Sequence, residues 1–347
     1  MNAISEFLYG ILAGINGIVG NYGVAIIIFT FLMRMICMPF DYKSRVGMRK
    51  MSLIQPKLNE IQRKYANDKT KMQQKQAELM KKEGYNPMSG CLPMLLTWPL
   101  MIAMFSAMRL IANEQLVMQT FRFLVGDENP IQLDEAFLWV KNIWMTDSPF
   151  AAAVPDLNSL KMVPRDAWVK VYEMVQQDEQ FFSALQTVMT NNGLVLDFST
   201  DAALSTSLTN LMKVLGNNEA YVAAAATVPG WANLNFLLFN VSIFQNYNGL
   251  LILPILAGVT QVLQTRFMNS QQPQQPAQNG QGTGNFMKWF FPMLSVYFCL
   301  SSNAGFALYW VVSSVVSSVQ SIVINKILEK KDGEKTNKKV AGEGSVK

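Results

Sequence analysis

Five apolar blocks, most of them roughly 19 to 25 residues long, constrain the fold more than any other feature of the sequence. An α-helix rises ~1.5 Å per residue, so such blocks match the ~30 Å hydrocarbon core of a bilayer. The blocks run over residues 22–40, 91–111, 249–267, 286–301 and 304–328. Only 15% of the 347 residues are charged, against about 25% in average proteins. We therefore predict an all-α polytopic membrane protein with five transmembrane helices.

The charge balance of the connecting segments predicts the orientation, because Lys and Arg near membrane spans favour the cytoplasm. Residues 41–90 carry 12 Lys and Arg against 5 Asp and Glu, and residues 325–347 carry 7 against 4. Residues 112–234 carry 6 against 14. We predict a multi-pass protein of the cell membrane, with the N-terminus outside and the C-terminus in the cytoplasm. Residues 1–21 are moderately apolar and are predicted to form a helix on the membrane surface.

The cytoplasmic segment 41–90 is predicted to be a helical hairpin. Its apolar residues recur in steps of 3, 4, 3 and 4, which is one heptad seam: Met51, Ile54, Leu58, Ile61 and Tyr65. Asn67 and Asp68 mark the turn, and Thr70 is suited to cap the second helix. The basic outer faces have two interpretations, a solvated surface or a surface that binds anionic lipid or ribosomal RNA.

The extracellular segment 112–248 is unusually long, with an α-helical insertion expected at about 151–245. Within it, Pro164–Met189 and Thr200–Gly216 have helical patterns. The Gln/Pro/Gly-rich residues 268–285 are predicted to be a flexible cytoplasmic loop, and the basic tail 329–347 to be disordered.

Arg34 is the unexpected residue, because it lies within the first span, six residues before Phe40. An arginine at mid-helix costs about 2.5 to 3.5 kcal/mol on membrane-insertion scales. One interpretation is that its long side chain snorkels to the cytoplasmic surface. The other is functional: Thr30 extends the polar stripe one turn deeper, and no Asp or Glu occurs in any of the five blocks. A cation without a counter-ion in the membrane needs water, which predicts a wetted cavity.

Other spans supply further polar groups. Hydrogen bonding between helices is the simpler explanation for them. The alternative is that they line a hydrophilic groove around Arg34. The candidate groove residues are Arg34, Thr30, Thr260, Gln261, Gln264, Ser313, Ser317 and Gln320.

Several classes of function are excluded or disfavoured. The absence of histidine excludes Ser–His–Asp and Cys–His nucleophiles and His-ligated zinc. The lack of carboxylates in the spans disfavours proton-coupled or cation-coupled transport. Cys37, Cys91 and Cys299 lack the spacing of a metal site or a disulfide framework, and no nucleotide-binding motif occurs. We expect no enzymatic activity, metal, cofactor or small-molecule substrate.

Several motifs, taken in order, resemble the YidC/Oxa/Alb family of membrane protein insertases. The motifs are FTFLMRMICMPF, SLIQPKLNEIQRKY, GYNPMSGCLPMLLTWPL, FLWVKNIW, LLILPILAGVTQVLQ and GFALYWVVSSVVSSVQ. The match is closest to Gram-positive-type bacterial members and covers residues 1–150 and 249–328. Residues 151–245 look like an insertion beyond the family core.

The resemblance implies a chaperone that inserts nascent inner-membrane proteins and helps them fold, through a cytoplasm-open groove carrying Arg34. Nascent membrane proteins are the implied partners, with the ribosome, the Sec translocon and anionic lipids as candidates. The hairpin would be a mobile capture element whose methionines adapt to varied substrates. The alternative is a passive channel or lipid scramblase that uses the same groove, and a third possibility is a purely structural assembly factor.

Overall fold

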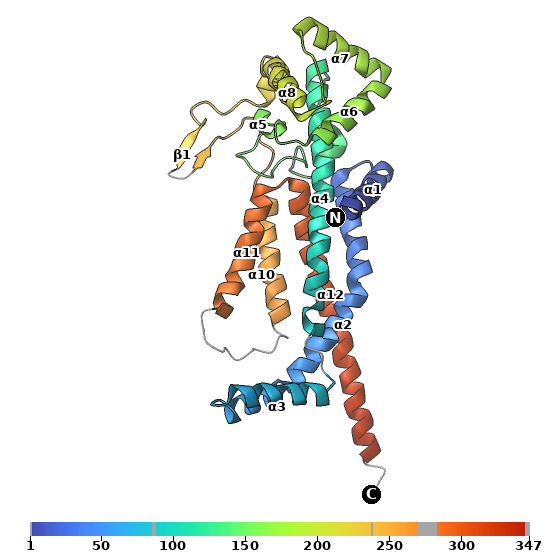
Figure 1. Cartoon of the computed structure of the whole chain (residues 1–347), viewed down its shortest axis with the longest axis vertical. Helices are drawn as coiled ribbons and strands as arrows, with labels where there is room; N and C mark the ends of the chain where they lie inside the picture. The colour runs from blue at the N-terminus through green and yellow to red at the C-terminus, as the bar shows by residue number, and fades with distance from the viewer. Residues whose placement is uncertain (1, 85–87, 237–238, 270–282, 344–347) are drawn as a thin grey trace. The chain divides into compact units, whose positions relative to one another are not determined.

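The computed structural model describes residues 2–84, 88–236, 239–269 and 283–343 (Figure 1). Side chains are described for residues 3–84, 99–234, 241–267 and 289–331. Most of the predicted Gln/Pro/Gly-rich loop and the last four residues of the tail therefore lie outside the described residues. The helices and strands, in chain order, are α1 (Asn2–Val19), α2 (Tyr22–Lys64), α3 (Lys69–Lys82), α4 (Met88–Val125), the short 3-10 helix η1 (Leu133–Glu135), α5 (Leu157–Leu160), α6 (Arg165–Gln177), α7 (Glu179–Asn192), α8 (Asp201–Gly216), α9 (Glu219–Ala224), β1 (Leu234–Phe236), β2 (Phe239–Val241), α10 (Ile252–Asn269), α11 (Thr283–Ser301) and α12 (Ala304–Glu343).

Three helices in the described residues are long and apolar enough to cross a membrane. They are α2, the 99–125 part of α4 and the 304–331 part of α12. These helices contain three of the five predicted spans, and α10 and α11 form at the other two. The fold is α-helical apart from β1 and β2, an antiparallel pair that the sequence analysis did not predict, with Leu234 opposite Val241.

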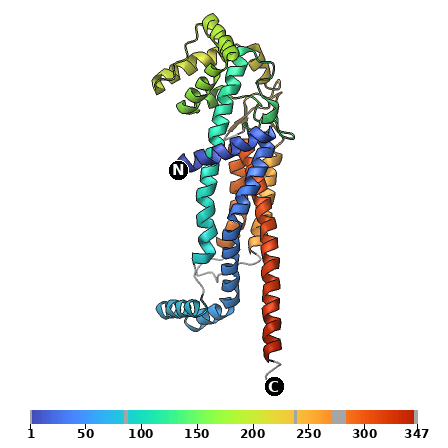
Figure 2. The ribbon, with the colours of Figure 1, turned by 90° about the vertical axis from the view of Figure 1, so that its right-hand side faces the viewer.

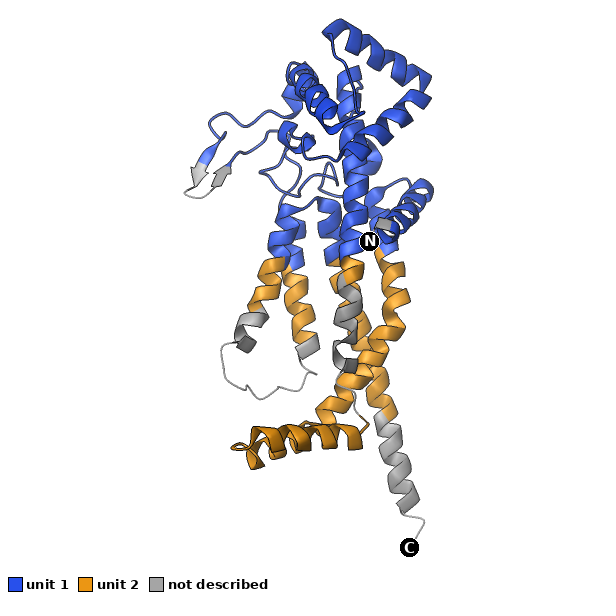
Figure 3. Ribbon diagram, in the orientation of Figure 1, with its two compact units in different colours: residues 1–29, 102–257, 295–310 blue, residues 30–101, 258–294, 311–347 orange. Residues whose placement is uncertain are grey.

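The chain packs as two compact units, which Figure 3 shows in different colours. Unit 1 comprises residues 1–29, 102–257 and 295–310, and unit 2 comprises residues 30–101, 258–294 and 311–347. Several helices contribute to both units, because each boundary falls inside a helix.

Two helices, the end of α2 and α3, occupy the segment predicted to be a hairpin, with two differences from the prediction. Helix α2 is continuous from the first span into the first arm, through Pro39 and Pro56. The second arm, α3, is capped by Asp68, whose carboxylate accepts a hydrogen bond from the Lys71 N–H (2.9 Å). Asp68 replaces Thr70 as the cap, because helix α3 already begins at Lys69.

The tail and the second span also extend further as helices than predicted. Helix α12 continues through Glu343, where disorder was expected from residue 329. This stretch of the sequence is rich in Lys and Glu, which have high helix propensity. Helix α4 continues to Val125, well beyond the predicted end of its span at residue 111.

Residues 151–245, the predicted insertion, form a small helical module in unit 1. The predicted helix Pro164–Met189 is two helices, α6 and α7, because Asp178 is extended and caps α7 through the Phe181 N–H. Helix α8 starts after Thr200, which caps it. The fully buried Trp168 ring of α6 packs edge-on against Phe121 of α4, with ring centroids 5.9 Å apart.

The two ends of the insertion pair with each other. Ala152 bridges Tyr247 in antiparallel fashion. The Ala153 N–H donates to the Asn246 carbonyl (3.0 Å), and the Asn248 N–H donates to the Ala151 carbonyl (2.9 Å). The insertion therefore leaves and rejoins the rest of unit 1 at one place.

Buried side chains hold the irregular segments around this base. The Asn142 amide donates to Gln119 of α4 and to the Ala153 carbonyl, and Asn248 accepts from the Asn142 N–H. The buried Asp147 carboxylate accepts from the N–H groups of Leu250 and Leu253 at the start of α10 (2.8 and 2.7 Å). A carboxylate at this position also interacts favourably with the helix dipole.

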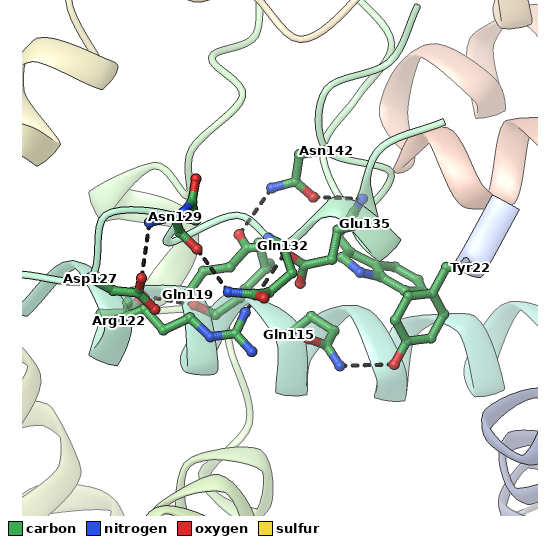
Figure 4. Close-up of polar contacts among 12 residues, drawn as sticks. Tyr22, Gln115, Gln119, Arg122, Asp127, Asn129, Gln132, Glu135 and Asn142 are labelled. Atoms are coloured by element: carbon green, nitrogen blue, oxygen red, sulfur yellow. Dashed lines mark hydrogen bonds and ion pairs between the residues drawn. The ribbon is translucent and has the colours of Figure 1, made fainter. Parts of the chain in front are cut away.

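Glu135 is a buried carboxylic acid at the end of η1, beside α4 (Figure 4). Its Oε2 accepts from the Gln132 N–H (2.8 Å) and lies 3.9 Å from Nη1 of Arg122. Burial raises the pKa of Glu135 to about 7, against the partial opposition of Gln119, Gln132 and Arg122. The folded state thus holds a proton that the unfolded chain releases near pH 4.5.

This proton predicts a pH-dependent local stability. Between about pH 4.5 and 7 the folded state binds more protons than the unfolded state. The free energy of opening should therefore fall as the pH rises through this window, by up to about 3 kcal/mol. Glu135→Gln should remove the dependence. Hydrogen exchange of the Ile143 amide, which donates to the Glu135 carbonyl (2.8 Å), measures it locally. Glu128→Gln, at an exposed position in the same loop, is the control. A Glu135→Gln profile that still follows wild type would contradict the assignment.

Candidate functional site

A polar face of α12 organises the candidate site in unit 2. Ser313, Ser317 and Gln320 lie at i, i+4 and i+7, which places them on one face of the helix. Figures 1 and 2 show α12 running beside α2. Small serine side chains let two helices approach closely and supply hydroxyls that bond across the interface.

Arg34 of α2 is held by this face. Its Nε donates to Oγ of Ser313 (2.9 Å), and Nη2 contacts the same oxygen. About two helical turns further along α12, Nε2 of Gln320 donates to the Arg34 carbonyl oxygen (3.0 Å). Ser313 and Gln320 are buried, whereas Arg34 is half-buried. Ser313 is neutral, so it fixes the position of the guanidinium without cancelling its charge.

The same face of α12 also contacts α10. Nε2 of Gln264 donates to Oγ of Ser317 (3.2 Å). Thr30 is fully buried one turn before Arg34, and Thr260 and Gln261 are half-buried on α10. The contacts described here bring Arg34 together with Ser313 and Gln320, and Gln264 together with Ser317.

Two polar atoms near these contacts are buried and have no hydrogen-bond partner among the described residues: Oε1 of Gln320 and Oγ of Ser44. Buried polar groups in folded proteins are almost always hydrogen-bonded, and ordered water supplies the partner where the protein does not. The unpaired oxygens are therefore suited to bind water.

The sequence analysis missed two residues of this region, Asp41 and Arg45. Arg45 is only 8% exposed and donates through Nη2 to Oγ of Ser321. The half-buried Asp41 carboxylate interacts electrostatically with both Arg34 and Arg45. The signal was present in the spacing, since residues 34, 41 and 45 follow helical periodicity. It was overlooked because the span was expected to end at Phe40.

Part of the apolar seam of the predicted capture hairpin is buried. Ile54 and Leu58 are buried, as is Met72 of α3, whereas Met51, Ile61 and Tyr65 are half-buried. An exposed ion pair between Lys57 and Glu83 (2.6 Å) links the two arms.

A family model described as 60Kd inner membrane protein matches residues 14–192 and 181–331 of the chain. The two matched ranges together cover most of the sequence, including every candidate groove residue and the hairpin.

Three similar proteins carry the name membrane protein insertase YidC. The protein from Pelodictyon phaeoclathratiforme is 37% identical over 143 residues, which is 40% of this chain and 21% of the relative. That from Chlorobaculum parvum is 39% identical over 134 residues, 38% of this chain and 20% of the relative. That from Fusobacterium nucleatum is 34% identical over 140 residues, 40% of this chain and 60% of the relative. The alignments thus cover about a fifth of the first two relatives.

The burial of the hairpin seam predicts which leucine keeps its arms together. Leu58 is 3% exposed, so Leu58→Ala should destabilise the hairpin by about 2–5 kcal/mol. Leu53, on the same helix and 69% exposed, is the matched control, and Leu53→Ala should cost less than about 0.5 kcal/mol. Limited proteolysis of the membrane-embedded full chain, followed by mapping of cuts within residues 51–82, measures the difference. Equal cleavage of the two variants would show that the arms do not pack.

Proposed function

The chain belongs to the 60Kd inner membrane protein family, and from this membership we propose that it is a membrane protein insertase. In this role it receives nascent inner-membrane proteins from the cytoplasm, assists their entry into the bilayer and helps them fold. The activity requires no bond chemistry by the chain itself. We also propose the Gram-positive-type subgroup of the family, because the motifs of the sequence resemble those members most.

The proposed topology has five spans, formed by α2, α4, α10, α11 and α12. The positive charge of residues 41–90 and 325–347 supports a cytoplasmic hairpin and C-terminus, with the N-terminus outside the cell membrane. Helix α1 is proposed to lie on the membrane surface. In support, Phe7 and Ile18 are 67% and 88% exposed, whereas Leu8 and Leu12 are buried.

The proposed substrate path is a hydrophilic groove open to the cytoplasm, with Arg34 as its cation. The observation that carries this proposal is the half-buried Arg34 guanidinium, which Ser313 positions but does not neutralise. The unpaired buried oxygens of Gln320 and Ser44 support a hydrated environment. Thr30, Thr260, Gln261, Gln264 and Ser317 are proposed to line the remaining polar surface.

The physical problem for an insertase is the polar flank of the incoming segment. A carboxylate pays several kcal/mol to enter hydrocarbon. A hydrated cation partway across the membrane lowers this cost by forming a transient ion pair. The apolar part of the segment then partitions into lipid, which drives insertion. A wet site suits this cycle, because a dry ion pair would be slow to release its substrate.

The hairpin is proposed to be the capture element on the cytoplasmic side. The half-buried Met51, Ile61 and Tyr65 offer apolar contact area, and the basic faces suit the ribosome or anionic lipids. The Sec translocon is a further proposed partner.

A passive channel or lipid scramblase is the second candidate, because the same polar surface could conduct ions or headgroups. Purified full-length protein in liposomes separates the two functions. Ion or lipid flux without a nascent chain favours the second candidate. A substrate segment protected from added protease favours the insertase.

The insertase proposal predicts a specific requirement for Arg34. Arg34→Ala should reduce insertion of a substrate with an acidic translocated flank at least about tenfold, since a charged hydrogen bond contributes ~1.5–3 kcal/mol. Arg34→Lys keeps the charge but loses the two-point contact with Ser313, so it should retain part of the activity. Protease protection of the substrate in proteoliposomes is the measurement.

Arg109→Ala is the control, because Arg109 is an exposed arginine on another apolar helix, α4. A substrate whose flank carries Asn in place of Asp should be much less sensitive to the Arg34 variants. A purely structural assembly factor would insert equally well with Ala, Lys or Arg at position 34, which would sink the groove mechanism.

A further inference from the structure

Arg34, Asp41 and Arg45 form a charged row on one face of α2. The separation of seven residues between the first two is close to two helical turns, and eleven residues are close to three. Asp41 and Arg45 are at the i, i+4 spacing, at which side chains on a helix are neighbours. The row therefore runs from within the first span to just beyond its predicted inner end at Phe40.

Both arginines of the row bind neutral partners on α12. Ser313 accepts from Arg34, and Ser321 accepts from Arg45. The two serines are eight residues apart, which is close to two turns, so α12 runs alongside the row. The hydroxyls satisfy the donors of the guanidinium groups and leave both positive charges in place.

Asp41 is the carboxylate in this row, and it is not ion-paired with either arginine. It makes no hydrogen bond and no ion pair within 4.0 Å with the described residues. Its charge nevertheless acts on Arg34 and on Arg45. The side chain is half-buried, so it retains access to solvent. Asp41 lies between the two arginines along the helix, so a change of its rotamer would bring the carboxylate closer to one or the other.

We propose that Asp41 is a competing counter-ion that shields Arg34 between insertion events and yields to the carboxylate of an incoming chain. Arg45 is the positioning residue that receives Asp41 when Arg34 is occupied. The inference deepens the proposed insertase function and rests on it. It assigns to Asp41 the discrimination between acidic and neutral flanks, because only an anion gains by displacing it.

Competition of this kind also promotes release. When the acidic flank of the substrate has crossed the membrane, Asp41 moves back towards Arg34 and replaces the departing carboxylate. The Arg34 guanidinium therefore always has an anion nearby. A lone arginine would bind acidic flanks more tightly but would let them go more slowly.

The test measures the flank preference of the full-length protein in proteoliposomes. Stalled nascent chains carry a photoreactive residue beside one flank position, which is either Asp or Asn. The readout is the ratio of crosslinking yields for the Asp and Asn flanks. Asp41→Asn should raise this ratio about two- to fivefold, the range of a partly exposed charge pair. Asp41→Glu keeps the charge and should stay near the wild-type ratio. Glu329→Gln removes one charge at an exposed position of α12 and should leave the ratio unchanged.

A second variant tests the role of Arg45. Arg45→Gln retains a donor for Ser321 but removes the charge, so Asp41 should remain near Arg34 and the ratio should fall below wild type. Size-exclusion profiles of each purified variant identify loss of folding, and Asp41→Glu provides the folded reference for Asp41→Asn.

The outcomes separate this inference from the proposed function. If wild type inserts substrates with an Arg34-dependent flank preference and Asp41→Asn leaves the ratio unchanged, Asp41 is not a competitor. An equal rise in crosslinking yield for the Asp and Asn flanks would likewise overturn the inference, because it would indicate a general change in binding. If wild type neither inserts substrates nor prefers acidic flanks, the proposed insertase function fails first.

Discussion

A permanent positive charge held by an uncharged hydroxyl is the interaction on which the candidate site depends. Arginine stays protonated under any condition a protein meets, whereas a buried lysine can become neutral by losing a proton and a buried carboxylate by gaining one. The Ser313 hydroxyl accepts the hydrogen bonds of the Arg34 guanidinium and fixes its direction. A carboxylate in place of the Ser313 hydroxyl would have formed a stable ion pair with Arg34, which would exchange partners slowly. The serine instead leaves a cation that is positioned in advance and still available.

Other contacts of α12 support this arrangement. Gln320 binds the carbonyl of Arg34, and Ser317 binds Gln264 of α10, so α12 contacts two other helices through one polar face. The side chains that make these contacts are short or end in an amide, which gives definite geometry at modest cost in conformational entropy. Apolar residues could hold the helices together equally well, but they would offer the Arg34 guanidinium no hydrogen-bond acceptor.

Spacing within the sequence predicted the residues of this face, but not which of them meet. Ser313, Ser317 and Gln320 follow helical periodicity, and Arg34 stands out by its charge alone. The pairing of Gln264 with Ser317 depends on the register between two helices more than fifty residues apart in the chain, which local pattern does not encode. Asp41 was overlooked for a different reason: hydropathy marks where lipid ends, whereas helix α2 continues without a break to Lys64. The β1–β2 pair and the helical tail were missed because short or highly charged segments carry weak periodic signals.

The predicted insertion, residues 151–245 in unit 1, shows how a long segment can be part of a fold without displacing the backbone on either side of it. Its ends run side by side, with Ala152 opposite Tyr247, and Asn142 and Asn248 secure the chain on either side of that junction. A segment whose ends are neighbours spans almost no distance, so its length and shape are free to vary while the flanking backbone stays in place. Asp147 caps the following helix from outside the inserted stretch. The junction is therefore a natural graft point, at which another domain with neighbouring ends could be exchanged for this one while the helices on either side keep their places.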